Sequence, residues 1–342
     1  MVGQTETRPW SQAMQQALYG PGGFYRSGAG PAAHFRTSVH ASPLFAAAVL
    51  RLLGEVDEAL NSPDELALVD VGAGRGELLE AVWSEASARE TLSRRLRLIA
   101  VDLADRPGEL DPVIEWRHTP PREVTGLLIA NEWLDNVPCD VVEATRDGWR
   151  VVEVAADGAE RIGSAPNPLD QEWLSTWWPK PETADTEPDP PPRAEIGLSR
   201  DAAWAEAVAT LDRGVAIAID YAHVRESRPP FGTLAGYAGG RQVMPAPDGS
   251  CDITAHVALD SCAATARADW TVHSTQREVF HSLGITGGRP ELALAASDPR
   301  GYLRALAQAS TAAELTDPHG LGAFGWLVQG VAVPVPASLT GL

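Results

Sequence analysis

The sequence predicts an α/β protein built on a mostly parallel β-sheet with helices on both faces. Short apolar runs of strand length alternate with segments whose apolar residues recur at helical spacing. Parallel strands are buried on both faces, so they read as continuous apolar runs. With 342 residues, 44% of them hydrophobic and 21% charged, the chain can bury the core of one large domain or two ordinary ones.

The first predicted strand and helix lie on either side of a glycine-rich turn. The run LALVDVGAGRGELLEAV begins at Leu66, passes three glycines at alternate positions and continues with apolar residues at helical spacing. Further apolar runs follow at 96–102, at 113–116 and from Gly126, where GLLIANEWLD ends in polar residues. We expect these runs to be strands of one sheet.

The pattern changes after Pro138 to that of an antiparallel insertion. Polar and apolar residues alternate on both sides of Asp147 and Gly148, a dipeptide typical of tight β-hairpins. The stretch 178–195 is rich in proline and acidic residues, which is the composition of a solvated loop. Trp173, Trp177 and Trp178 beside it form either an exposed aromatic platform or the underside of a lid.

The alternation of helix and strand resumes near residue 199. We predict a helix that is capped by Ser199 and stops at Gly214, followed by the apolar strand VAIAIDYA. Two last strands begin at Trp270 and Phe324 and bracket two helices, the second over about 299–309. The predicted division is an N-terminal helical segment at 1–60, a core at 61–138 and 199–335, and an insertion at 139–198 that holds the hairpin and the acidic loop.

Composition excludes several function classes. The 46 acidic and 27 basic residues give a formal net charge of -19, the wrong sign for a surface that binds nucleic acid. Lys180 is the one lysine, so neither a P-loop nor a pyridoxal Schiff base is expected. Cys139, Cys251 and Cys262 are widely spaced and the histidines lack metal-ligand spacing, which predicts neither a disulfide framework nor a metal site. Without a signal-like segment or a long apolar run, we expect a cytoplasmic protein.

The glycine turn is the candidate cofactor site. Gly72, Gly74 and Gly76 let the backbone turn sharply and let a ligand lie against it, while the following helix presents free N–H groups. In the dinucleotide fingerprint G-x-G-x-x-G the third glycine comes one position later. Asp70 suits the ammonium group of S-adenosylmethionine (SAM) better than a pyrophosphate, and Asp102 can accept two ribose hydroxyls. SAM is therefore favoured over NAD. The alternatives are a turn kept for packing, and Asp102 as a cap of the segment after it.

A second polar motif ends the fourth apolar run. Asn131 and Glu132 fall at the carboxyl end of the predicted strand, where open α/β sheets bind their ligands. The Glu132 carboxylate can hold a guanidinium group through two hydrogen bonds. Its alternative role is that of an acidic residue in the first turn of a helix.

Eight motifs along the chain are ALYGPGGFY from Ala17, HFRTSVHASPLF from His34, VDVGAGRGELLEAV from Val69, ANEWLDNVP from Ala130, AIDYAH from Ala218, GTLAGYAGG from Gly232, CDITAHV from Cys251 and STQREVFHSLGI from Ser274. In this order they resemble the motifs of the MidA-like SAM-dependent methyltransferases, whose mitochondrial members are complex I assembly factors that methylate a protein arginine. The resemblance extends to about Gly284. It implies a Rossmann-like class I methyltransferase core with a seven-stranded sheet, SAM as cofactor and S-adenosylhomocysteine as product.

The resemblance also implies roles for particular residues. Those that would bind the cofactor are Asp70, Gly72, Ala73, Gly74, Gly76, Asp102 and Asn131. Those beside the reacting methyl group would be Asn131, Glu132 and Asp135. Those in the N-terminal segment that covers the site would be Tyr19, Phe24, Tyr25, His34, Thr37, Ser38 and His40. The family pattern is closer to GDF-x-TSPE, so two imidazoles, His34 and His40, replace carboxylates that would help to receive an arginine.

These features predict in-line methyl transfer to a protein side chain, with arginine the first candidate and no catalytic triad required. Two alternatives stay open. One is a small-molecule O- or N-methyltransferase on the same core, and the other is a catalytically weak partner-binding assembly factor. The expected partner is a protein or small-molecule acceptor rather than nucleic acid or a membrane. The oligomeric state is open, with a dimer as one option.

Overall fold

A computed structural model describes residues 6–26, 43–180 and 189–342. The chain forms two compact units. Unit 1 comprises 1–35, 133–206 and 221–266, and unit 2 comprises 36–132, 207–220 and 267–342. Within the described ranges, no helix is both long enough and apolar enough to cross a membrane.

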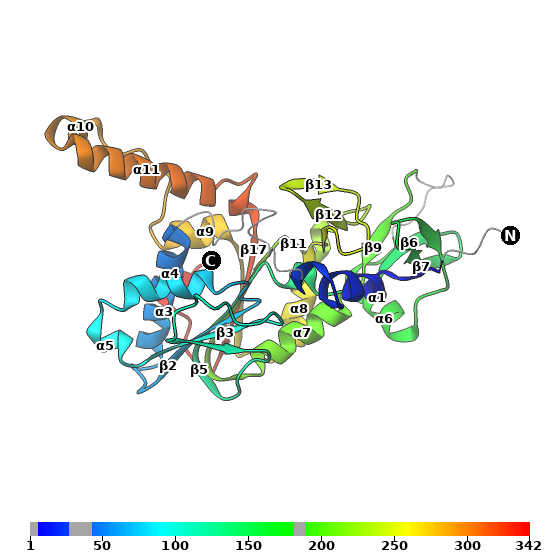
Figure 1. Ribbon diagram of the computed structural model, residues 1–342, viewed down its shortest axis with the longest axis horizontal. Coiled ribbons are helices and arrows are strands. Elements are labelled where there is room, and N and C mark those ends of the chain that lie inside the picture. Colours follow the sequence, from blue (N-terminus) through cyan, green and yellow to red (C-terminus); the bar gives the residue numbers. More distant parts are fainter. Residues whose placement is uncertain (1–5, 27–42, 181–188) are drawn as a thin grey trace. The chain divides into compact units, whose positions relative to one another are not determined.

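Unit 2 is built on a seven-stranded sheet in the order β16-β17-β10-β5-β2-β3-β4 (Figure 1). Five strands pair in parallel: β2 (Leu66–Val71), β3 (Leu96–Val101), β4 (Ile114–Arg117), β5 (Val124–Asn131) and β10 (Leu211–Asp220). The strand β17 (Gly325–Val331) runs antiparallel to both β10 and β16 (Trp270–Thr275). This mixed, mostly parallel sheet confirms the predicted fold class. The strand order reverses between β2 and β5, which is where open α/β sheets bind ligands.

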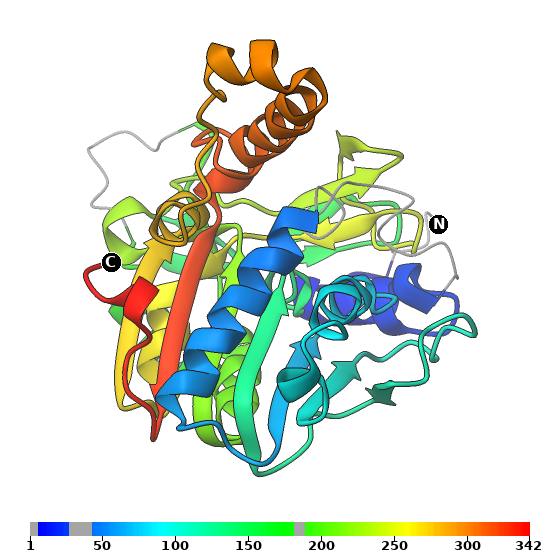
Figure 2. The same ribbon diagram turned by 90° about the vertical axis from the view of Figure 1, so that its left-hand side faces the viewer.

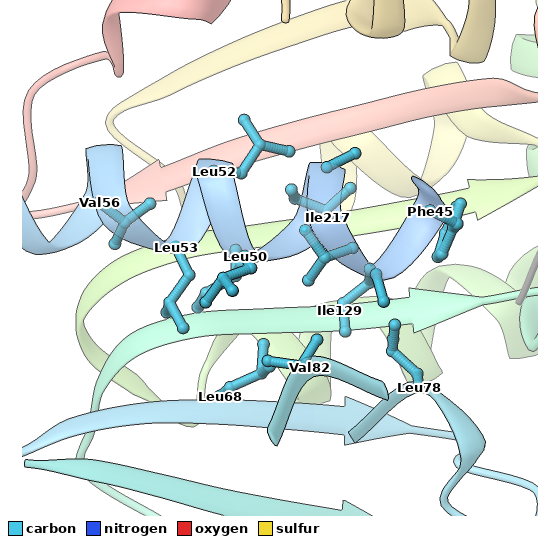
Figure 3. Close-up of a cluster of buried hydrophobic side chains, with 14 of the residues drawn as sticks. Phe45, Leu50, Leu52, Leu53, Val56, Leu68, Leu78, Val82, Ile129 and Ile217 are labelled. Carbon is cyan, nitrogen blue, oxygen red and sulfur yellow. The ribbon is translucent and has the colours of Figure 1, made fainter. Parts of the chain in front are cut away.

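The main core of unit 2 lies between one face of this sheet and the helices α3 (Pro43–Ala59) and α4 (Glu77–Ala86). Figure 2 shows α3 lying along one face of the sheet, and Figure 3 shows the side chains that meet there. Apolar residues on one side of α3 face the sheet because they recur at helical spacing. The residues labelled in Figure 3 are Phe45, Leu50, Leu52, Leu53, Val56, Leu68, Leu78, Val82, Ile129 and Ile217. All six residues of β2 are buried, as the continuous apolar run predicted.

Two glycines allow the central strands to approach one another closely. A Cβ on Gly126 would lie 2.1 Å from the Ala67 carbonyl oxygen, and one on Gly214 would lie 2.0 Å from the Gly126 oxygen. The prediction that Gly214 ends a helix capped by Ser199 is therefore wrong. The helix α7 (Leu198–Val208) starts before Ser199 and ends before β10, and Gly214 lies within β10. The Ser199 hydroxyl instead donates to the Pro138 carbonyl oxygen at 2.5 Å.

The remaining helices of unit 2 are short, with one exception. They are α5 (Glu90–Ser93), α9 (Gln276–Ser282), α10 (Leu292–Ser297), α11 (Pro299–Leu315), η6 (Leu321–Ala323) and η7 (Ala337–Leu339). The pair α10 and α11 forms a hairpin that extends from the rest of unit 2 (Figures 1 and 2). The start of α11 matches the prediction, but the helix continues past 309 because Ala312 and Leu315 are buried at its far end.

Unit 1 consists mainly of short strands. A five-stranded sheet contains β1 (Arg8–Pro9), β6 (Val141–Thr145), β7 (Gly148–Val154), β8 (Glu160–Ile162) and β9 (Arg193–Glu195). A three-stranded sheet contains β12 (Ala235–Ala238), β13 (Arg241–Val243) and β14 (Asp252–Thr254), while β11 (Ala222–His223) pairs with β15 (Val257–Ala258). The predicted hairpin is confirmed, since β6 and β7 pair antiparallel and Gly148 has φ +109°.

The helices of unit 1 come from all three of its chain segments. They are α1 (Trp10–Met14), η1 (Gln15–Tyr19), η2 (Phe24–Arg26), η4 (Leu134–Asn136), α6 (Pro168–Trp177), most of α7, η5 (Arg225–Ser227) and α8 (Leu259–Thr265). Trp173 and Trp178 are buried, so they are not part of an exposed platform. The Trp173 indole N–H donates to Asp201 Oδ2 at 2.7 Å, which fixes the ring in the interior.

Candidate functional site

The glycine turn of unit 2 follows β2 directly. The N–H groups of Gly72 and Ala73 donate to the Val101 carbonyl oxygen at 2.9 and 3.2 Å and tie the turn to β3. Gly72, Gly74 and Gly76 have φ of +75°, +60° and +90°, a region that glycine adopts without strain. The structure thus forms the sharp, glycine-rich turn that the sequence predicted, immediately before α4.

Two acidic side chains lie beneath and beside this turn. Asp70 is buried, and burial together with the charges of Glu77 and Asp102 raises its pKa to about 8. Asp102 Oδ2 accepts the Gly74 N–H at 2.9 Å and its Oδ1 accepts the Ala104 N–H at 2.8 Å. Burial raises the pKa of Asp102, and these hydrogen bonds offset part of the rise. Asp102 therefore caps the segment after β3, and each of its oxygens retains a second lone pair for a hydroxyl donor.

The end of β5 carries the second predicted motif. Glu132 follows the strand with φ +51°, a left-handed conformation that is unusual for a residue other than glycine. Its N–H donates to the Ile219 carbonyl oxygen at 2.8 Å, and its Oε1 accepts the Asn131 side-chain amide at 3.1 Å. Asn131 Oδ1 is buried and has no hydrogen-bond partner within the described residues. The alternative that placed Glu132 in a first helical turn is wrong, because η4 begins at Leu134.

A further acid at this edge was not predicted as a site residue. Asp220 ends β10, the strand beside β5, and is 1% exposed. The register pairs Ile219, the residue before it, with Asn131. The signal was available in the sequence, since Asp220 follows an apolar run just as Asp102 does.

In unit 1, Asp135 lies close to a buried arginine. The Arg200 guanidinium donates to the backbone carbonyl oxygens of Asp135 at 2.8 Å, Val137 at 3.1 Å and His256 at 2.9 Å. Burial raises the pKa of Asp135 to about 6, and the charge of Arg200 acts in the opposite direction. Both side chains are less than 5% exposed.

The predicted tyrosines of the N-terminal segment come together in unit 1. The Tyr25 hydroxyl lies 2.9 Å from Asn136 Oδ1 and 3.0 Å from Asp252 Oδ1. Tyr19 donates to the Asn136 carbonyl oxygen at 3.1 Å, and its ring stacks on that of Tyr25 with 5.6 Å between centroids. Phe24 is buried and meets Tyr25 edge to face.

Asp252, at the start of β14, was also missed by the sequence analysis. It is 1% exposed, and its Oδ1 accepts the Asn136 side-chain amide at 2.9 Å. Burial and the nearby charge of Asp135 raise the pKa of Asp252 to about 7. The only signal in the sequence was a carboxylate within the motif CDITAHV, to which no role was given.

The predicted site residues are therefore distributed over both units. Unit 2 holds Asp70, Gly72, Ala73, Gly74, Gly76, Asp102, Asn131 and Glu132, and unit 1 holds Tyr19, Phe24, Tyr25 and Asp135. His34, Thr37, Ser38 and His40 lie outside the described residues. In the part of the chain that the structure describes, no group of three or more His, Cys, Asp or Glu side chains is placed to hold a metal ion.

The fold and the glycine turn define a class I methyltransferase that uses SAM. The model of a family described as "Putative S-adenosyl-L-methionine-dependent methyltransferase" matches residues 49–276, more than half of the chain. The chain belongs to this family, the MidA or COG1565 family of SAM-dependent methyltransferases. The predicted family, enzyme class and cofactor are thereby confirmed.

Two solved structures agree with this assignment over nearly the whole chain. Both are COG1565 superfamily proteins from Burkholderia thailandensis, with a TM-score of 0.76, and each comparison covers 98% of this chain and 90% of the other. One is 24% identical and is bound to S-adenosylhomocysteine, and the other is a native structure at 25% identity. No curated protein matches the chain.

Proposed function

We propose that this methyltransferase transfers the methyl group of SAM to a side-chain nitrogen of a protein arginine. The observation that carries the proposal is the position of Glu132 at the carboxyl end of β5. Its backbone is held in a left-handed conformation by the hydrogen bond to Ile219, and its carboxylate is held by Asn131. A fixed carboxylate at this edge of the sheet is suited to bind a guanidinium group through two parallel hydrogen bonds.

The residues of unit 2 fit the cofactor that the family implies. Gly76 has φ +90°, where any other residue would be strained, and a Cβ there would also lie 2.6 Å from Leu110 Cδ1. The buried Asn131 Oδ1 lacks a partner among the described residues and is available to a donor. Gly72, Gly74, Asp102 and their neighbours would hold the cofactor, which supplies an electrophilic methyl group on a sulfonium.

The part that Glu132 would take in the reaction is to hold and orient the acceptor nitrogen. In-line displacement depends chiefly on alignment of the reacting atoms. The guanidinium nitrogen gains a methyl group and loses one proton, so the charge of the guanidinium is the same before and after. A carboxylate hydrogen-bonded to that nitrogen can accept the proton and pass it to solvent.

The test compares Glu132→Gln with Glu58→Gln, a change at an exposed position of α3. Each protein is incubated with methyl-labelled SAM and a protein extract, and the hydrolysed product is analysed for methylarginine. We expect the wild type and Glu58→Gln to produce methylarginine. Glu132→Gln should lower turnover at least 100-fold, or about 3 kcal/mol of transition-state stabilisation, while the affinity for S-adenosylhomocysteine stays within twofold.

Unchanged turnover in Glu132→Gln would refute the role of that residue. Label in another amino acid, or in small molecules only, would refute the arginine acceptor and favour the small-molecule alternative. Cofactor binding without any transfer would favour a partner-binding assembly factor.

A further inference from the structure

The hairpin of α10 and α11 takes no part in the proposed function. It extends from the rest of unit 2 (Figures 1 and 2), and the far end of α11 is anchored there by the buried residues Ala312 and Leu315. A stripe of exposed residues follows α11 from its first turn to its last, and we call it the outer face. The outer face consists of Arg300, Leu303, Arg304, Ala307, Ser310 and Glu314.

These six residues share one side of α11 because they recur at intervals that return to the same side of a helix. At 3.6 residues per turn, each of them lies within about 60° of the direction in which Ala307 points. The centre of the outer face is therefore a small apolar residue, and the larger Leu303, which is 64% exposed, lies one turn away from it. A small residue at this position allows a second helix to approach to about 8 Å between the axes.

The charges of the outer face are divided between its two ends. Arg300 and Arg304 lie in the first turns of α11, whereas Glu314 lies in the last turn. Ala307 is midway in the sequence between Arg300 and Glu314. A second copy of this face, turned end to end about a two-fold axis at Ala307, would place each Arg300 opposite the Glu314 of the other copy. The outer face is thus complementary in charge to itself when the two helices run antiparallel.

The charge of the hairpin favours self-association more than that of the chain as a whole. With a formal net charge of -19, two copies of the chain repel one another in most orientations. Residues 291–315, which span the hairpin, contain three acidic and two basic side chains and are therefore nearly neutral. Two copies that meet through their hairpins bring together a part of the surface with little net charge.

We propose that the outer face of α11 binds the outer face of a second copy of this chain as an antiparallel pair of helices. Leu303 of each copy then packs beside Ala307 of the other, and an Arg300–Glu314 ion pair lies on either side of the two-fold axis. Every contact of such an interface occurs twice. Exposed ion pairs contribute little each, so their main effect is to fix the direction of the pairing.

The first test measures the dimer dissociation constant of the full-length protein by sedimentation equilibrium. An interface of two helices is small, so we expect a dissociation constant of about 1 to 100 µM. Arg300→Glu, like Glu314→Arg, turns two attractive contacts into repulsive ones and should raise this constant at least about tenfold. The combined variant Arg300→Glu/Glu314→Arg restores opposite charges and should return the constant to within about threefold of the wild-type value.

Leu303→Asp tests the apolar part of the interface. It should raise the dissociation constant at least about tenfold, because it places two carboxylates at a contact that excludes water. Leu169→Asp is the matched control, since Leu169 is a leucine of similar exposure, 68%, on α6 of unit 1. The control should dimerise like the wild type. Both variants change an exposed side chain, so the affinity for S-adenosylhomocysteine and the thermal unfolding midpoint should not change.

A disulfide formed across the two-fold axis tests the register of the pairing. Two cysteines can be joined when their Cα atoms lie about 4.4 to 6.8 Å apart, which is the spacing expected at a helix crossing centred on a small residue. Ala307→Cys should therefore give a covalent dimer under mild oxidation, whereas the exposed Leu169→Cys should not. The native cysteines Cys139, Cys251 and Cys262 are buried.

A wild-type protein that is monomeric throughout the concentration range would overturn the proposal. A dimer that is insensitive to both Arg300→Glu and Leu303→Asp would overturn it as well, because such a dimer uses another surface. Failure of the combined charge reversal to restore dimerisation, or of Ala307→Cys to form a covalent dimer, would exclude the antiparallel pairing at Ala307. None of these outcomes depends on the identity of the methyl acceptor.

Discussion

Replacement of Asp252 by Asn should change how the stability of the protein depends on pH. In the unfolded chain an aspartate has a pKa near 4, whereas burial and Asp135 raise that of Asp252 to about 7. Between these values the folded protein retains a proton that the unfolded chain has released. The free energy of unfolding therefore falls as pH rises through this window.

The size of the effect follows from the shift. About three pKa units at 1.36 kcal/mol each correspond to about 4 kcal/mol, of which about 3 kcal/mol is lost between pH 4.5 and pH 8. Asparagine does not ionise, so the free energy of unfolding of Asp252→Asn does not fall with pH for this reason. An amide nitrogen without an acceptor costs about 1 to 3 kcal/mol at either pH. The free energy of unfolding of the variant, measured relative to that of the wild type, should thus rise by about 3 kcal/mol between pH 4.5 and pH 8.

The measurement is urea-induced unfolding of both proteins at the two pH values. The quantity compared is the free energy of unfolding of the variant minus that of the wild type, at pH 8 relative to pH 4.5. Groups common to both proteins cancel in this quantity. Asp135 adds to the gain, because loss of the neighbouring charge favours its ionised form. Asp248→Asn is a control of opposite sign, since hydrogen bonds from Ser250 lower the pKa of Asp248. A stability difference between Asp252→Asn and the wild type that does not vary with pH would refute the reasoning.

Three other variants test the fold and the site. Gly126→Ala would place a Cβ 2.1 Å from the Ala67 carbonyl oxygen, at φ +147°. The free energy of unfolding in urea should therefore fall by more than about 3 kcal/mol. A fall of less than about 1 kcal/mol would contradict the close approach of the two strands. Gly74→Arg, at φ +60°, should abolish calorimetric binding of S-adenosylhomocysteine while circular dichroism stays native, and retained binding would remove the turn from the cofactor site. Arg200→Met removes a buried guanidinium that donates to three backbone carbonyl oxygens, so thermal or urea unfolding should show a loss of about 3 to 5 kcal/mol. An unchanged free energy of unfolding would show that water replaces the guanidinium.

The strands of the central sheet were predictable because burial on both faces produces a local signal. The runs that begin at Leu66 and Leu96 became β2 and β3 with nearly unchanged bounds. The end of α7 was not predictable in the same way. In the sequence, Gly214 resembles a glycine that ends a helix. In the structure it lies within β10, where a side chain would prevent the close approach of Gly126 in β5. Nothing near Gly214 in the sequence reports that contact.

The same distinction applies to the candidate site. Asp70, Asp102 and Glu132 stand at strand or turn boundaries, so a local pattern indicated them. Asn136 and Asp252 are more than 100 residues apart in the chain, and only the folded structure shows the hydrogen bond between them. No local pattern could therefore pair them. A single carboxylate in the motif CDITAHV was the sole local sign of that pairing.

The division of the chain bears on how such an enzyme can diverge. The chain leaves unit 2 after Glu132 and again after Asp220, and both departures follow the carboxyl end of a central strand, β5 or β10. The segments of unit 1 thus lie outside the parallel strands and the glycine turn, at places where chain can be inserted without lengthening a strand. Unit 1 can therefore diverge in sequence while the sheet and the glycine turn of unit 2 are kept, which is a route by which one ancestral methyltransferase gives rise to relatives that differ mainly in unit 1.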